Sequence, residues 1–173
     1  MIVITDGKSN REEGREIEEA TITKSTPFNI RIVAIGVTEE PDYITLQQVA
    51  TDSAAVIRTP SYQVLSNEID KIINISCSNH SCAGPPDIIL ILDSSGSITD
   101  KGRSNWRYLQ SFSQKLIEGL ERKRDPRFAY VQFSDGALIR DFYTKDSGKV
   151  KKSILDSSHI NGWTNQAAAL RTA

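Results

Sequence analysis

The chain has 173 residues, a quarter of them charged, and a formal net charge of −1 at pH 7. This length is enough for one well-buried domain and short for two. Because there is no surplus of basic residues, we expect no binding to nucleic acid. No apolar stretch approaches the length of a membrane span, so we also expect no transmembrane segment.

The first part of the chain alternates predicted strands and helices. Ser9 predicts the N-cap of a charged helix, because Glu12 three residues later completes a capping-box pattern. Apolar residues at three- and four-residue spacing predict a further helix that ends near Cys77. The predicted elements are a strand at 1–5, a helix from Ser9, a strand at 30–37, a short helix from Pro41, a strand at 54–57 and a helix from Ser61.

Residues 77–86 have the composition of a linker and end in two prolines, which cannot continue a helix. Neither Cys77 nor Cys82 belongs to a Cys-x-x-Cys pair, so a zinc site has poor support. Asn74 and Asn79 each begin a glycosylation sequon. Two sequons beside two cysteines favour an oxidising, secreted context. The first residues lack the features of a signal peptide, so secretion would require a leader upstream in a longer protein.

The second part of the chain begins with five apolar residues, Ile88 to Leu92, which predict a strand buried on both faces. Such strands lie at the centre of parallel sheets. The predicted elements that follow are a long amphipathic helix from Trp106 to Leu120, a hairpin of strands at 128–133 and 138–143, a helix at 150–155 and a last helix after Thr164.

The polar cluster Asp93-Ser94-Ser95-Gly96-Ser97 follows the central strand directly. Because Asp93, Ser95 and Ser97 alternate, their oxygens are able to converge at the carboxyl end of the strand, where open α/β sheets bind ligands. A simpler interpretation explains the same residues equally well, since Ser95 or Ser97 could be a helix N-cap.

Two further segments favour a ligand site. They are Gly162-Trp163-Thr164-Asn165 before a run of alanines, and the strand that ends at Asp6-Gly7. Together with the polar cluster they resemble the metal-ion-dependent adhesion site (MIDAS) of the von Willebrand factor A domain family, whose pattern is Asp-x-Ser-x-Ser, then a distant Thr, then a distant Asp. The matching residues here are Asp93, Ser95, Ser97, Thr164 and Asp6. The order departs from the family, because Asp6 precedes the other four.

The resemblance implies an α/β fold: a Rossmann-like, open, mostly parallel sheet with helices on both faces and one antiparallel edge strand. It also implies that residues 1–76 are the C-terminal half of one such domain and residues 87–173 the N-terminal half of the next, as in one period of a tandem array. The halves would close into one circularly permuted domain, or pair between chains in a swapped dimer. Cys77 and Cys82 would flank the end and the start of one domain, so they could form a disulfide.

Hydroxyl and carboxylate ligands suit a hard cation, and the resemblance implies Mg²⁺ or Mn²⁺. An open coordination position would accept an acidic side chain from a partner protein. Gly162, Trp163, Asn165 and Lys8 would form the rim that faces this partner. Trp163 could anchor an interface there, although packing over the helix end is the interpretation that we favour.

We therefore expect a metal-dependent protein-binding module of an extracellular adhesion or matrix protein, and not an enzyme. A Mg²⁺-dependent phosphoryl-handling enzyme is a competing hypothesis, but the cluster lacks a His, Cys or Lys base and a Gly-rich phosphate loop. An intracellular scaffold with the same fold is the other alternative. Reduced cysteines and unoccupied sequons would favour it.

Overall fold

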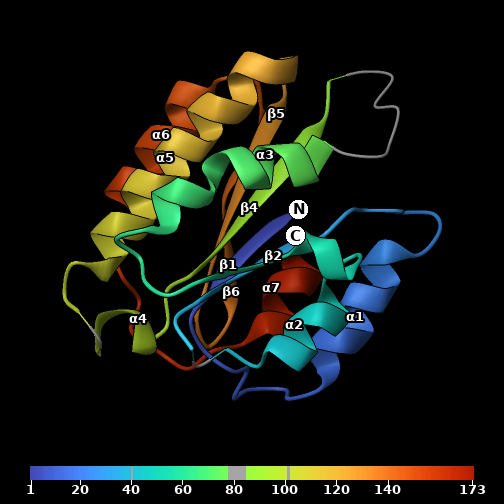
Figure 1. Ribbon diagram of the computed structural model, residues 1–173, viewed down its shortest axis with the longest axis vertical. Coiled ribbons are helices and arrows are strands. Elements are labelled where there is room, and N and C mark those ends of the chain that lie inside the picture. Colours follow the sequence, from blue (N-terminus) through green and yellow to red (C-terminus); the bar gives the residue numbers. More distant parts are fainter. Residues whose placement is uncertain (40, 78–84, 101) are drawn as a thin grey trace.

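The computed structural model describes residues 1–39, 41–77, 85–100 and 102–173 (Figure 1). Strands and helices alternate along most of the chain. The strands are β1 (Ile2–Thr5), β2 (Val33–Val37), β3 (Val56–Thr59), β4 (Asp87–Asp93), β5 (Arg127–Phe133) and β6 (Ala137–Thr144). The helices are α1 (Arg15–Lys24), α2 (Tyr43–Val49), α3 (Ile69–Cys77), α4 (Ser97–Asp100), α5 (Asn105–Arg124), α6 (Ser147–Asp156) and α7 (Gln166–Thr172).

The strands of the described residues form one sheet in the order β3-β2-β1-β4-β5-β6. Neighbouring strands are parallel, except that β6 pairs with β5 antiparallel at one edge. Strands β1 and β4 are adjacent although the segment between them holds two other strands, and Ile4 lies opposite Leu92. Because both strands are parallel, the residues that follow them emerge at the same edge of the sheet.

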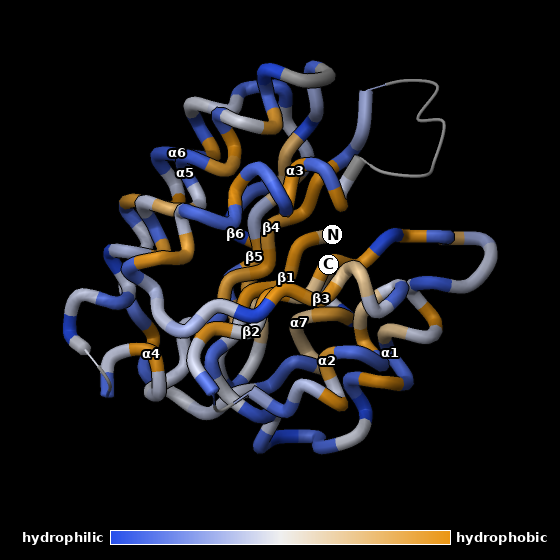
Figure 2. Tube along the Cα trace, in the orientation of Figure 1, coloured by the Kyte–Doolittle hydropathy of each residue, from blue (hydrophilic) through white to orange (hydrophobic). Residues whose placement is uncertain are grey.

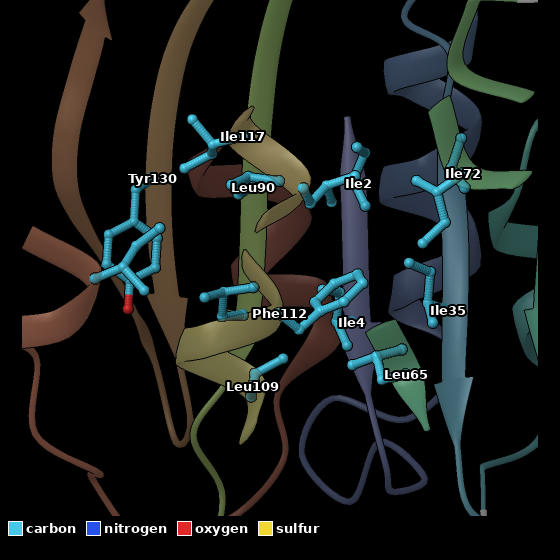
Figure 3. Close-up of a cluster of buried hydrophobic side chains, with 14 of the residues drawn as sticks. Ile2, Ile4, Ile35, Leu65, Ile72, Leu90, Leu109, Phe112, Ile117 and Tyr130 are labelled. Atoms are coloured by element: carbon cyan, nitrogen blue, oxygen red, sulfur yellow. The ribbon is translucent and has the colours of Figure 1, made fainter. Parts of the chain in front are cut away.

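Helices cover both faces of the sheet, which confirms the predicted fold class (Figure 1). Alternate residues of each central strand enter different clusters: Leu90 packs with α3, α5 and α6, whereas Ile91 packs with α1 and α7. Figure 2 shows the apolar strands enclosed by helices with polar outer faces. In Figure 3, Phe112 of α5 lies in the same cluster as Ile4 of β1. This two-sided burial explains the uninterrupted apolar runs of β1 and β4.

Several predicted boundaries were wrong. Strand β2 begins at Val33 and not at residue 30, and helix α6 begins at Ser147 and not at residue 150. Helix α1 begins after Gly14 and not after Ser9, whose hydroxyl donates to the carbonyl of Arg11. Strand β3 begins later than predicted because Ser53–Ala55 form a 3₁₀ turn. The helix predicted from Ser61 is a 3₁₀ turn at Leu65–Glu68 that leads into α3. The β5–β6 hairpin and the long α5 helix were predicted correctly.

The predictions for the linker fall largely outside the described residues. Cys82 and Asn79 lie there, and so does the proposed Cys77–Cys82 disulfide. Asn74 is exposed on α3, which is compatible with glycosylation at that sequon. Within the described part of the chain, no helix has the length and the apolar character needed to cross a membrane.

Candidate metal site

The candidate site lies where β1 and β4 end side by side. Thr5 is the last residue of β1 and Asp93 the last of β4. The Thr5 hydroxyl donates to Oδ2 of Asp93 at 2.6 Å, and the backbone N–H of Ser95 donates to Oδ1 at 2.8 Å. Asp93 is fully buried. Burial raises the pKa of its carboxyl, while the hydrogen bonds from Ser95 and Thr5 oppose that rise.

Asp6, the residue after β1, is also fully buried and lies beside the serines. The Ser97 hydroxyl donates to Oδ1 of Asp6 at 2.7 Å, and the Ser95 and Ser97 hydroxyl oxygens are 3.2 Å apart. These side chains contact one another across a long separation in sequence. The contacts favour the site interpretation of Ser97 over the simple helix-cap interpretation.

Thr164 joins the cluster through its neighbour Gly7. A Cβ atom placed on Gly7 would lie 3.4 Å from the Ser97 hydroxyl oxygen and 3.4 Å from that of Thr164. The two hydroxyls therefore flank Gly7. Asn10 holds the Thr164 backbone in place, since its Oδ1 accepts from the Thr164 N–H at 2.7 Å and its own N–H donates to the Thr164 carbonyl at 3.0 Å.

The loop before Thr164 is bound to the polar cluster by its backbone. The N–H of Gly96 donates to the Gly162 carbonyl at 2.9 Å, and the N–H of Gly162 donates to the Ser134 hydroxyl at 2.9 Å. A Cβ on Gly162 would lie only 2.0 Å from Oδ2 of Asp135. It would also lie 2.6 Å from the hydroxyl oxygen of the buried Ser134, so a larger residue at position 162 would force both side chains to move.

The residues predicted to form the rim differ in their exposure. Trp163 is 56% exposed, so much of the residue is accessible to a partner. The Arg11 guanidinium lies 5.6 Å from the centroid of its ring. Asn165 is buried and caps α7, since its Oδ1 accepts from the Ala168 N–H. It therefore supports the loop and is not an exposed rim residue, whereas Lys8 is exposed.

The donor set suits a hard divalent cation. Two buried carboxylates and three hydroxyls converge at one edge of the sheet, and oxygen ligands of this kind are those that Mg²⁺ and Mn²⁺ prefer. Among the described residues, no group of three or more His, Cys, Asp or Glu side chains could hold a metal ion. Binding would therefore depend on the Ser and Thr hydroxyls as well as on the carboxylates.

Sequence reasoning missed the residues that support the site. Thr5 donates to Asp93, Asn10 holds Thr164, and the amide of Gln132 donates to the Ser94 hydroxyl at 2.9 Å. These contacts join residues that are far apart in sequence. The alternation of Asp93, Ser95 and Ser97 gave a local signal, but nothing local marks Asn10 or Gln132 as a partner.

In a mostly parallel sheet, a polar cluster at the carboxyl ends of the central strands lies where open α/β domains bind their ligands. The family model of the von Willebrand factor type A domain matches residues 87–173. The chain therefore belongs to that family. Residues 1–86, which contain Asp6, lie outside the match.

Known proteins similar to the chain include a collagen chain and two solved structures. The collagen alpha-5(VI) chain of Mus musculus is 30% identical over 137 residues, which are 78% of this chain and 5% of that one. This chain thus spans a small part of that relative. A structure of proximal thread matrix protein 1 from the mussel byssus, with a zinc-occupied MIDAS motif, is 26% identical with a TM-score of 0.47, covering 99% of this chain and 44% of that one. An uncharacterised protein from Alicyclobacillus acidocaldarius is 14% identical with a TM-score of 0.66, covering 99% and 89%, and shares the fold.

Proposed function

We propose that the chain is a metal-dependent protein-binding module that binds Mg²⁺ or Mn²⁺ and, through the metal, an acidic side chain of a partner protein. The observation that carries the proposal is the convergence of Asp6, Asp93 and three hydroxyls at the ends of β1 and β4. The five predicted ligands come from three separate parts of the chain, and the fold brings them to one edge of the sheet.

Each residue has a distinct role in this proposal. The hydroxyls of Ser95, Ser97 and Thr164 are uncharged ligands, so a bound cation would keep enough positive charge to attract a carboxylate. Asp93 and Asp6 would anchor the cation directly or through water. The bound metal would supply the positive charge to which the partner's carboxylate binds. Thr5 orients Asp93, and Ser97 is already oriented by its hydrogen bond to Asp6.

The domain organisation is a second part of the proposal. Residues 1–76 would be the C-terminal half of a von Willebrand factor A domain, residues 77–86 a linker, and residues 87–173 the N-terminal half. The pairing of β1 with β4 within one chain supports closure into one permuted domain. Exchange of the same strands between chains would give a swapped dimer, which the molecular mass in solution distinguishes.

We further propose that the module belongs to a secreted matrix or adhesion protein, since it resembles part of a collagen VI chain. A disulfide between Cys77 and Cys82 and glycosylation at Asn74 and Asn79 would accompany secretion. An intracellular scaffold remains the alternative for a protein with reduced cysteines. No general base from His, Cys or Lys is among the five proposed ligands, which favours binding over phosphoryl transfer.

Calorimetric titration with MgCl₂ and MnCl₂ tests the metal site. We expect saturable binding to the parent protein, a large loss of affinity in Ser97→Ala, and no change in Ser111→Ala, which alters an exposed serine of α5. Absence of saturable binding, or equal binding by the two variants, would contradict the proposal. In the presence of Mn²⁺, N-acetyl-aspartate methylamide should bind, and EDTA should abolish that binding.

A further inference from the structure

A pocket of about 380 Å³ opens beside the candidate metal site. It is lined by the loop after β1 and by residues at the starts of α1, α2 and α7. The residues of its lining that matter here are Lys8, Glu13, Glu16, Asp42, Thr45 and Gln166.

The pocket adjoins the site. Lys8 and Ser9 of the lining follow Asp6 and Gly7 in the chain. Gln166 of the lining donates through Nε2 to the carbonyl of Gly7 at 3.1 Å. A partner that places one side chain at the metal site would therefore have the pocket within reach of its neighbouring residues.

The lining is acidic, with Glu13, Glu16 and Asp42 against the single amine of Lys8. Asp42 caps α2, and its Oδ1 accepts the N–H groups of Ile44 and Thr45 at 3.1 and 3.3 Å. These hydrogen bonds, first of all that from Thr45, lower the pKa of Asp42 and keep it ionised. The pocket thus carries an excess of negative charge.

Glu16 is the feature that points to a ligand. It is only 4% exposed although it lines the pocket, and its Oε2 atom has no hydrogen-bond partner among the described residues. A buried carboxyl oxygen without a donor is costly. A donor that enters the pocket would remove this cost.

We infer that the pocket takes a basic side chain, a guanidinium or ammonium group, of the same protein partner whose acidic side chain binds the metal. The inference rests on the proposed function and adds the second recognition element of the partner. A guanidinium presents several N–H donors, which suit a lining with more than one carboxylate.

The pocket is tested apart from the metal by NMR titration of the ¹⁵N-labelled chain in EDTA with N-acetyl-arginine methylamide. We expect saturable shifts at the amides of Gly14, Glu16 and Thr45, and a smaller response to N-acetyl-glutamine methylamide, which carries no charge. Affinity for the arginine probe should fall at least fivefold in Glu16→Gln and remain unchanged in Glu18→Gln, an exposed glutamate of the same helix. Equal responses to both probes, or equal affinities of both variants, would overturn the inference.

A second variant and a peptide experiment complete the test. Glu13→Gln alters an exposed residue of the lining and should also weaken arginine binding, so the inference does not depend on the folding of Glu16→Gln. In Mn²⁺, peptides that carry both an aspartate and an arginine at varied spacing should bind at least tenfold tighter than their arginine-to-glutamine counterparts. If no spacing gives a gain, the shared partner is refuted. Failure of the aspartate probe alone, with arginine binding intact in EDTA, would instead refute the metal-dependent function.

Discussion

Replacement of Thr5 by valine tests whether the buried polar network builds the site. The substitution keeps the shape of the side chain and removes the hydroxyl that donates to Oδ2 of Asp93 at 2.6 Å. Asp93 is 0% exposed, so water does not readily replace the lost donor. A buried acceptor deprived of its donor costs about 1–3 kcal/mol, and more when it is charged. We therefore expect the free energy of unfolding to fall by about 2 kcal/mol.

The same change should weaken the metal site, because an orienting partner of a ligand is worth roughly 10–100-fold in affinity. Urea unfolding in EDTA measures the stability, and calorimetry with MnCl₂ measures the affinity. Thr5→Ser keeps the hydroxyl and should retain most of the affinity. Thr59→Val is a matched control, since Thr59 is buried at the end of β3 and, within the described ranges, its hydroxyl donates only to the Ser61 carbonyl at 3.4 Å. Equal effects of Thr5→Val and Thr59→Val on both quantities would refute the reasoning.

Gly162→Ala should reduce metal affinity more than tenfold, because its Cβ would lie 2.6 Å from the hydroxyl oxygen of the buried Ser134, which accepts the Gly162 N–H. Gly136→Ala, with nothing within 4 Å of its Cβ, should bind normally in the same calorimetric assay. Phe112→Ala should lower the free energy of unfolding by about 3–5 kcal/mol, because it opens a cavity between α5 and the sheet. Phe142→Ala, at a residue that is 77% exposed, should change it by about 0.5 kcal/mol or less. Mn²⁺ at a hundred times its Kd should stabilise the folded chain by about 2.7 kcal/mol and so raise the thermal midpoint. The same midpoint in Mn²⁺ and in EDTA would contradict a metal site in the folded state.

The sequence by itself determined the class of fold and most of the candidate ligands. The apolar run at Ile88 to Leu92 has no polar alternation, so it required cover on both faces, and the structure provides it. The alternation of Asp93, Ser95 and Ser97 is a local pattern. Where a strand ends in a turn, such alternate side chains come together on one side of the chain. Local patterns were less informative for α1. The capping-box pattern predicted a helix start at Ser9, but residues 9–11 instead donate hydrogen bonds to the Thr164 carbonyl.

Only the tertiary structure decided which distant residues support the site and how the predicted ligands are held together. The parallel pairing of β1 with β4 brings Thr5 and Asp6 to Asp93 and Ser97, across about half of the chain. The burial of Glu16 likewise depends on the packing around the start of α1, and the run of glutamates around it in the sequence gave no sign of it. Such contacts arise from strand order and helix packing, which bring together groups that have no relation in sequence. A polar side chain acquires its role from the neighbours that the fold places around it, and a linear pattern records only the neighbours along the chain.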